Sequence, residues 1–316
     1  AGLLFQLPDV PQPTSLLVVT NYEALQRFHP NEFTHLKTWL ERLGSVYDTA
    51  REGRDPGAIR ARVRELVRQQ SKAAVFIFGG DDVVPFCDRQ NPCFRQGGDE
   101  DRIYGDDFYS DLDGDAQMLP DMDVGRIPDD PDIIRSPQSA LYRALESDLP
   151  MRSPARASSV ANRRRPAADD VISVINPASE NQNLFWSAPH TAQSIPPAFY
   201  QDNSLYLILH GSLGDGSRYT GETDAGGYPE AFNLASVAPA DVVVSSACYG
   251  GFVRGRTAKN SIGLAFLARG CRAFIGHSGA SYSPGTGLPE SGEAYFARLF
   301  LEEYRRGVPA STAFRL

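Results

Sequence analysis

Two residues suited to covalent and acid–base chemistry each follow an apolar run in the second half of the chain. His210 comes after the run 205–209 (Leu-Tyr-Leu-Ile-Leu), and Cys248 comes after the run 241–247. A cysteine thiolate attacks carbonyl carbon, and a nearby imidazole takes up and returns the proton. If the two runs form adjacent parallel strands, their carboxyl ends meet at one edge of a sheet. The pattern therefore predicts acyl transfer by a cysteine–histidine pair.

Each residue alone has a simpler interpretation. Cysteine is often buried as a small hydrophobic residue, and a histidine at a strand end is usually just hydrogen-bonded. The pairing favours catalysis, because both residues end a strand-like run and both are followed by glycine within three residues. The backbone N–H groups of Gly211 and Cys248 are expected to stabilise an oxyanion. Cys271 begins a strand-like run instead, and we assign it to the core.

The elements that would position these residues alternate between strand and helix. Buried strands are predicted at 16–20 and 73–78, and three more at 205–209, 241–247 and 272–276. Helices are predicted at 32–43, from Pro56 through Val67, at about 137–149 and at about 290–306. This alternation is typical of an α/β fold.

Charge and proline mark the organisation of the chain. Residues 99–132 hold 13 acidic and two basic side chains, so the acidity of the protein is local. The prolines and the arginine run of residues 150–170 indicate a boundary. We expect two units, an N-terminal α/β subdomain at 1–152 with an acidic loop region and a catalytic subdomain at 153–316.

Composition excludes several classes of protein. The 316 residues are 41% hydrophobic, but no apolar stretch approaches the roughly 18 residues of a membrane span. A net charge of −8 disfavours nucleic-acid binding, which needs clustered basic residues. The four cysteines fit neither a disulfide scaffold nor paired zinc ligands. The first residues do not resemble a signal peptide, and localisation stays open.

Several segments together resemble a known family. The blocks LYLILHGS and VVVSSACYGG resemble the His-Gly and Cys blocks of caspase-like cysteine peptidases. VFIFGGDDVVP, the segment ending in DVGRIP, and RAFIGHSGASYSP are similar to the gingipain family within that clan. The resemblance implies a caspase-like three-layer α/β/α fold with a mostly parallel sheet. It also implies a cysteine endopeptidase acting on protein or peptide substrates without a catalytic cofactor, and a secreted or cell-surface location.

The resemblance also assigns site residues. His210 matches the catalytic histidine and Cys248 the nucleophile, while Asp121, with Asp123 in reserve, matches the acid that orients the imidazole. The loop from Ser278 onward matches the wall of the substrate pocket, with Tyr282 as a lid over the P1 side chain.

A basic P1 side chain would be selected by an acidic pocket. Asp129, Asp130 and Asp132 follow the position where the resembling family places its P1-reading carboxylate, with Asp132 the first choice. A preference for Arg or Lys would also allow self-cleavage at the run Arg163-Arg164-Arg165.

The acidic segment has two interpretations, a solvated face or a cation site. Asp111, Asp113 and Asp115 have the alternate spacing that wraps hard cations, although the sixth and twelfth positions lack the Gly and Glu of an EF-hand. Family members bind calcium, which indicates a structural Ca²⁺ here.

Two other functions remain open on the sequence. Gly79-Gly80-Asp81-Asp82 looks like the metal-binding hairpin of nucleotide cyclases, although Pro85 cannot donate to a returning central strand. A caspase-like scaffold can also serve as a non-catalytic binding or signalling module, because geometry makes a dyad competent. Labelling of Cys248 by a peptidyl electrophile would distinguish the two, because a non-catalytic module should not react faster than a free thiol.

Overall fold

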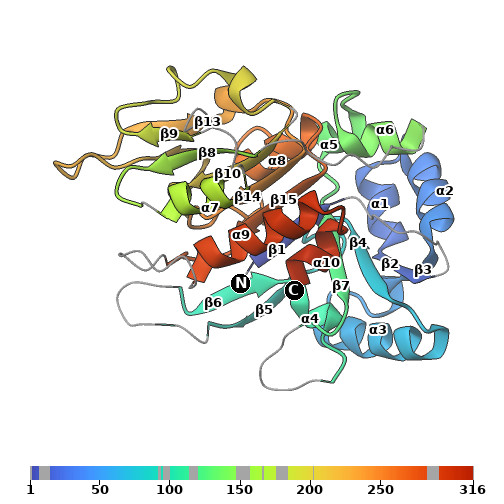
Figure 1. The fold of residues 1–316 in the computed structure, drawn as a ribbon. Coiled ribbons are helices and arrows are strands. Elements are labelled where there is room, and N and C mark those ends of the chain that lie inside the picture. The colour runs from blue at the N-terminus through green and yellow to red at the C-terminus, as the bar shows by residue number, and fades with distance from the viewer. Residues whose placement is uncertain are drawn as a thin grey trace.

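A computed structural model describes residues 2–6, 15–91, 94, 100–113, 120–146, 157–165, 167–175, 184–201, 203–282 and 292–315. A ten-stranded sheet forms its centre, in the order β3-β2-β4-β7-β1-β15-β14-β10-β8-β9 (Figure 1). In chain order its strands are β1 (Gly2–Gln6), β2 (Leu16–Thr20), β3 (Ser45–Asp48), β4 (Ala74–Phe78), β7 (Asp123–Ile127), β8 (Ala157–Asn162), β9 (Leu184–Ser187), β10 (Ser204–Ile208), β14 (Val242–Ser245) and β15 (Ala273–His277).

The sheet consists of two parallel halves that run in opposite directions. Strands β3, β2, β4, β7 and β1 are parallel to one another, and so are β15, β14, β10, β8 and β9. The two halves meet where β1 pairs antiparallel with β15, with Gly2 opposite His277 and Gln6 opposite Ala273. The carboxyl ends of the N-terminal half therefore lie at the sheet edge opposite to those of the C-terminal half.

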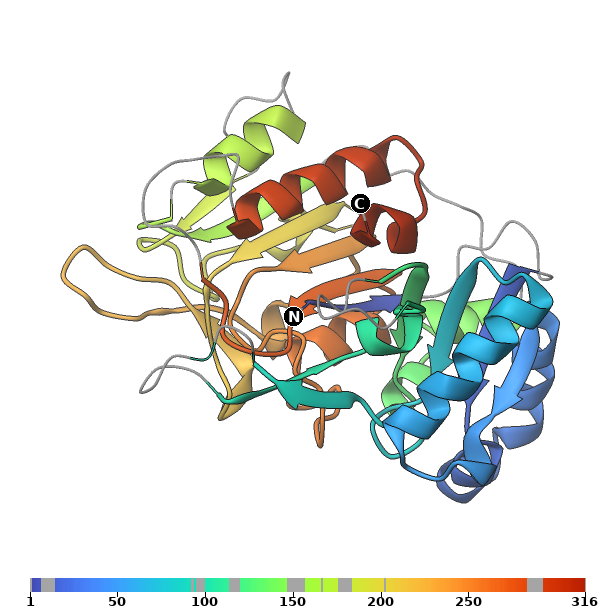
Figure 2. The same cartoon turned by 90° about the horizontal axis from the view of Figure 1, so that it is seen from below.

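Helices cover both faces of the sheet, which gives three layers (Figures 1 and 2). The helices are α1 (Tyr22–Phe28), α2 (Phe33–Leu43), α3 (Pro56–Gln70), α4 (Asp107–Ser110), α5 (Pro131–Arg135), α6 (Ala140–Glu146), α7 (Ala167–Ile175), α8 (Ile262–Ala268), α9 (Gly292–Arg305) and α10 (Ala310–Arg315). Within the described residues, no helix is both long and apolar enough to cross a bilayer.

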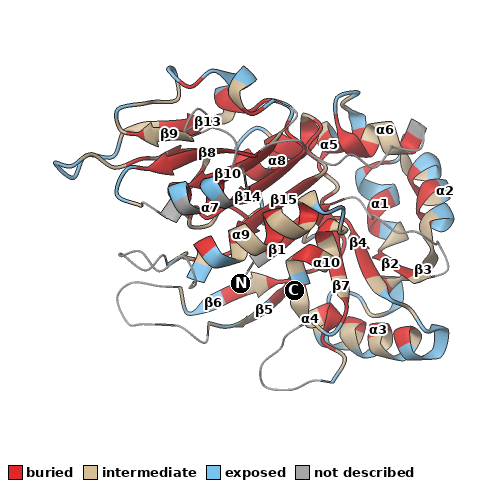
Figure 3. Ribbon diagram, in the orientation of Figure 1, coloured by how far each residue is buried: buried red, intermediate tan, exposed pale blue. Residues whose placement is uncertain are grey.

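Alternating residues of the strands in the C-terminal half of the sheet contribute side chains to two apolar cores, one on each face. Tyr206 and Ile208 pack in a cluster with residues of α7, α9 and α10, whereas Leu205 and Leu207 pack in the cluster that contains α8. Successive side chains of a strand point to opposite faces, so a strand covered on both faces is apolar throughout. Figure 3 shows the strands of the sheet as mostly buried.

Two smaller sheets stand outside the central one. β11 (His210–Ser212), β12 (Asp215–Thr220) and β13 (Glu230–Asn233) form an antiparallel sheet beyond the end of β10. β5 (Cys87–Gln90) and β6 (Arg102–Gly105) form a hairpin.

The predicted α/β fold is confirmed, and the long predicted elements lie within a few residues of the observed ones. Asp55 caps α3 by accepting the Gly57 N–H at 2.8 Å, ahead of Pro56 at the first helical position. The interpretation of 150–170 as a boundary overlooked β8, a fully buried strand between β10 and the edge strand β9. β8 is rich in Ala and Ser and has a single branched apolar residue, Val160, so its sequence gives little sign of a strand. The division at residue 152 stays a prediction.

Candidate active site

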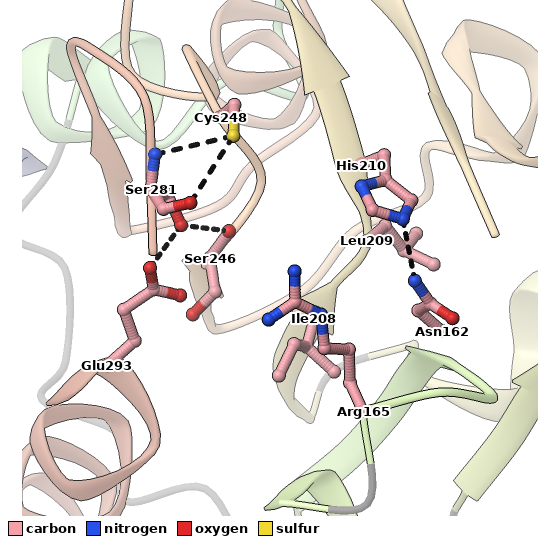
Figure 4. A pocket seen from close by; sticks show the side chains of 9 residues that line it. All are labelled: Asn162, Arg165, Ile208, Leu209, His210, Ser246, Cys248, Ser281 and Glu293. Atoms are coloured by element: carbon pink, nitrogen blue, oxygen red, sulfur yellow. Dashed lines mark hydrogen bonds between the residues drawn. The ribbon is translucent and has the colours of Figure 1, made fainter. Parts of the chain in front are cut away.

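The candidate site lies beyond the carboxyl ends of four consecutive strands, β8, β10, β14 and β15. β10 and β14 are hydrogen-bonded parallel neighbours, with Leu205 opposite Val243. This is the adjacency that the sequence argument required. One pocket is lined by side chains that follow these strand ends and by the first turn of α9 (Figure 4). Its lining residues are Asn162, Arg165, Ile208, Leu209, His210, Ser246, Cys248, Ser281 and Glu293.

The loops that carry His210 and Cys248 are in direct backbone contact. A Cβ atom on Gly211 would lie 2.0 Å from the carbonyl oxygen of Cys248, so only glycine permits this approach. The cysteine turn is also fixed to the end of β15, because the Tyr249 N–H donates to the Gly279 carbonyl at 2.9 Å. Tyr249 adopts a left-handed conformation with φ of 57°. The sharp turn thus presents Cys248 at the pocket wall.

The Cys248 thiol is half-buried, and its surroundings act on it in opposite directions. Burial raises the pKa of the Cys248 thiol most, and the Glu293 carboxylate raises it further. The Ser281 N–H, which donates to Sγ at 3.3 Å, and the Arg165 guanidinium lower that pKa, but the net effect is upward. The thiol is therefore mainly protonated until a proton acceptor takes its proton.

On the facing side of the pocket, two side chains contact the same nitrogen of the His210 imidazole. Nε2 lies 2.8 Å from Asn162 Nδ2 and 3.2 Å from Glu222 Oε2. The Asn162 amide is oriented by its own oxygen, which accepts the Arg164 N–H at 2.9 Å. With Nε2 held in this way, the other ring nitrogen is turned toward the pocket (Figure 4).

The carboxylate of Glu222 is the acidic partner of this imidazole. Burial raises the pKa of Glu222, but hydrogen bonds from His210, Asn162 and Arg164 outweigh burial and hold it below its usual range. Arg164 Nη1 donates to Glu222 Oε1 at 2.7 Å. When Nε2 carries a proton, it donates to the negative Glu222, which stabilises an imidazolium as a general acid at His210 requires. Asn162 Nδ2 is itself a donor and can bond only to an unprotonated Nε2.

Glu222 takes the place that the sequence analysis expected for Asp121. The Asp121 carboxylate instead accepts the N–H groups of Leu112 and Asp113, at 2.5 and 3.0 Å. The reserve, Asp123, accepts from Thr312 and from Arg315 of α10. Glu222 reaches His210 because β12 folds back on β11 and pairs Thr220 with His210, a register that the sequence does not disclose.

The carboxylates proposed to read P1 lie at the other edge of the sheet. Asp129, Asp130 and Asp132 follow β7, whose carboxyl end points away from the ends of β10 and β14. Asp129 Oδ2 lies 2.9 Å from His29 Nε2, and Asp130 accepts the Ala258 N–H at 3.0 Å. The reversal of strand direction at β1 thus separates all three from the pocket.

Among the residues expected to form the pocket wall, Ser278 is buried and Tyr282 is 60% exposed. Ser281, in the same loop, is the residue that lines the pocket. The side chain of Glu293 also lines it and bonds to Ser281 Oγ. Burial raises the pKa of Glu293. Sequence reasoning missed Glu293 and Arg165. Glu293 follows a segment with no apolar signal, and Arg165 was interpreted only as part of a cleavage site.

A cluster of carboxylates is present in the acidic segment, and it includes Asp121, which was not among the predicted cation ligands. Ligand atoms of Asp111, Asp113 and Asp121 lie within 4.8 Å of one another, while Asp115 lies outside the described residues. Arg60 Nη2 already pairs with Asp111 at 2.6 Å, and Asp121 binds backbone N–H groups. Three carboxylates are a donor set that Ca²⁺ accepts, but their charge here is partly balanced by protein groups.

The cyclase interpretation does not agree with the topology. Gly79 to Asp82 follow β4, and both neighbours of β4 in the sheet are parallel to it, so no metal-binding hairpin is present there. Asp81 pairs with Arg54 and Arg254 at 3.1 and 3.0 Å. These aspartates form ion pairs between loops at the strand ends that lie opposite to the pocket.

Comparison with known proteins agrees with this geometry. Residues 10–131 match the sequence model of peptidase family C25, and no curated protein matches the chain. The fold is similar to the crystal structure of the Arg-specific cysteine proteinase gingipain R, with a TM-score of 0.61 and 14% identity over 98% of this chain and 73% of that one. The chain is thus similar to peptidase family C25 over residues 10–131, and along nearly its whole length it has the α/β fold of gingipain R.

Proposed function

We propose that the protein hydrolyses peptide bonds through Cys248 and His210, with a preference for Arg or Lys at P1. The observation that carries the proposal is the joint lining of one pocket by the thiol and the imidazole, at the ends of two adjacent strands. Glu222, which accepts a hydrogen bond from Asn162 Nδ2 at 3.3 Å, positions the imidazole in this proposal.

The proposed reaction proceeds by two acyl transfers. The Cys248 thiol gives its proton to His210, and the sulfur attacks the scissile carbonyl carbon, whose oxygen becomes an oxyanion near the N–H groups of Gly211 and Cys248. The oxyanion collapses and breaks the C–N bond, and the imidazolium gives its proton to the departing amine. Water then attacks the thioester while His210 takes a proton from it, and the thiol leaves with that proton. No cofactor takes part in these steps.

The preference for a basic P1 residue is supported by Glu293. Its carboxylate is the acidic group that lines the pocket together with Cys248. Arg165 lines the same pocket and would disfavour a basic side chain, so the two residues act in opposite directions. Because the pKa of Glu293 is raised by burial, the preference for Arg over a neutral residue should grow as pH rises through that pKa.

Cleavage profiling on a mixed peptide library tests the whole proposal. The wild type should cleave after Arg and Lys, and Cys248→Ala and His210→Ala should lose cleavage by at least about 10³-fold. Glu293→Gln should reduce the preference for Arg over Gln at P1. Cleavage that survives Cys248→Ala, or a preference for acidic P1 residues that Arg165→Gln abolishes, would contradict it. A non-catalytic binding module would show neither cleavage nor rapid labelling of Cys248 by a peptidyl electrophile.

Self-cleavage at residues 163–165 belongs to the same proposal. Arg164 pairs with Glu222, and Arg165 lines the pocket, so cutting this run would disturb the site itself. Self-cleavage there should lower activity with time, and intact-mass analysis of wild type and Cys248→Ala after the same incubation would detect it.

A structural Ca²⁺ at Asp111, Asp113 and Asp121 is a separate part of the proposal. Bound Ca²⁺ would neutralise the carboxylates and tie the acidic loop together. Addition of a chelator should then lower the melting temperature of the wild type but not of Asp113→Asn. Equal melting temperatures with and without Ca²⁺ would exclude it.

A further inference from the structure

An exposed tyrosine lies against the imidazole of the candidate site. The Tyr228 side chain is 61% exposed. Its ring centroid is 5.3 Å from that of His210, with the rings at 82° in an edge-on arrangement. A large aromatic surface is thus open to solvent beside the proposed general acid, and a substrate could cover it.

The loop that carries Tyr228 is closed by its own hydrogen bonds. The Gly221 N–H donates to the Pro229 carbonyl at 2.9 Å, and the Thr223 N–H donates to the Gly227 carbonyl at 2.8 Å. Glu222, near one end of this loop, contacts Nε2 of His210, and Tyr228, near the other end, contacts the ring. A loop fixed in this way holds the tyrosine in place before substrate arrives, which lowers the entropic cost of binding.

The chemistry of acyl transfer decides which part of the substrate lies on each side of the pocket. The imidazole must give its proton to the departing nitrogen, so that nitrogen and the P1′ residue attached to it lie on the side of His210. The acyl part stays on the sulfur, beside Ser281, whose N–H donates to Cys248 Sγ. Tyr282, next to Ser281 and exposed to the same degree, lies on the acyl side.

We infer that Tyr228 is a specificity-determining residue for the leaving-group side and selects an apolar P1′ residue by packing against it. This inference rests on the proposed dyad. The aromatic ring rather than the hydroxyl makes the contact, so phenylalanine should replace it. A P1′ side chain that covers the ring is expected to raise kcat/KM about 10-fold over glycine.

The test uses internally quenched peptides that share the best P1 residue and carry Gly, Ala, Leu or Phe at P1′. The wild type and Tyr228→Phe should prefer Leu and Phe over Gly about 10-fold, and Tyr228→Ala should lose that preference. Tyr282→Ala is the matched control, and it should change the P1 profile while keeping the P1′ preference. Melting temperatures of all variants would show that the fold is kept.

The outcomes separate the inference from the proposed function. If Tyr228→Ala lowers kcat/KM equally for every P1′ residue, the tyrosine only positions His210 and the specificity assignment is wrong. The assignment is also wrong if Tyr282→Ala removes the P1′ preference as fully as Tyr228→Ala does. If wild type shows no cleavage that depends on Cys248, the proposed dyad fails, and the role of Tyr228 fails with it.

Discussion

At the scale of single residues, the charges around Cys248 should set how easily its thiol ionises. Glu293 raises the pKa of this thiol and Arg165 lowers it, so the two charges oppose each other in one pocket. Glu293→Gln should therefore shift the pH midpoint of Cys248 alkylation downward, and Arg165→Gln should shift it upward. Each midpoint can be measured from the rate of iodoacetamide labelling against pH, with Cys248→Ala to subtract other thiols. Shifts in the same direction in both variants would refute this account of the pocket.

Glu222 gives a second prediction at this scale. Its carboxylate stabilises the imidazolium and fixes the ring through Nε2, so Glu222→Gln should lower kcat by about 10²-fold or more with little change in KM. Asp121→Asn serves as the control, since Asp121 binds the backbone of its own loop. Equal losses in the two variants would argue against Glu222 as the positioning residue.

At the scale of elements, activity should depend on the close contact between the loop that carries His210 and the loop that carries Cys248. Gly211→Ala would place a methyl group 2.0 Å from the Cys248 carbonyl, so the histidine and cysteine turns must separate. Activity should fall about 10²-fold or more, because small displacements of reacting groups have effects of this size. Gly214→Ala is a control for the general effect of glycine replacement, because an added Cβ there would meet only Ser212 Oγ at 3.8 Å. Retention of full activity in Gly211→Ala would mean that the two turns need not touch.

The elements also explain which side chains form the site. Four adjacent strands end at the pocket, and a hairpin folded back beyond β10 returns Glu222 to the histidine that begins it. The first turn of α9 adds Glu293 from the opposite wall. The site is therefore a product of strand order, one hairpin register and the position of one helix.

At the scale of the whole molecule, a buried ion pair in the N-terminal half of the sheet should dominate stability there. Arg126 of β7 is fully buried and makes two hydrogen bonds to Asp106, at 2.6 and 2.8 Å. It also donates to the carbonyls of Gly79 and Val84. Arg126→Met would leave a buried carboxylate unpaired and should cost about 3–5 kcal/mol of unfolding free energy.

Urea denaturation measures this cost. Arg62→Ala is the control, because Arg62 and Glu65 form an exposed pair on α3 and their loss should leave the midpoint unchanged. An Arg126→Met midpoint equal to that of wild type would contradict the argument.

The reversal of the sheet has a functional consequence as well. Ligand sites in parallel sheets lie beyond the carboxyl ends of the strands, and here the two halves have these ends at opposite edges. The aspartates after β4 and β7 therefore cannot join the cysteine and histidine, although they belong to segments that resemble the same family. Their side chains form ion pairs and caps that tie loops together.

The sequence by itself determined the α/β class, the long strands and helices, and the residues that follow the strands of the C-terminal half. Those features are local, because apolar periodicity and caps act within about a dozen residues of chain. His210 and Cys248 could be predicted to lie at one pocket because parallel neighbours bring their carboxyl ends together whatever lies between them in the chain.

Only the tertiary structure decided which carboxylate meets the imidazole and which edge of the sheet each aspartate occupies. Glu222 depends on the register of a hairpin, Glu293 on where α9 begins, and Asp132 on the antiparallel junction between β1 and β15. The two strands of that junction come from opposite ends of the chain. Contacts of this kind are fixed by long-range pairing and burial, for which a local sequence pattern carries no signal.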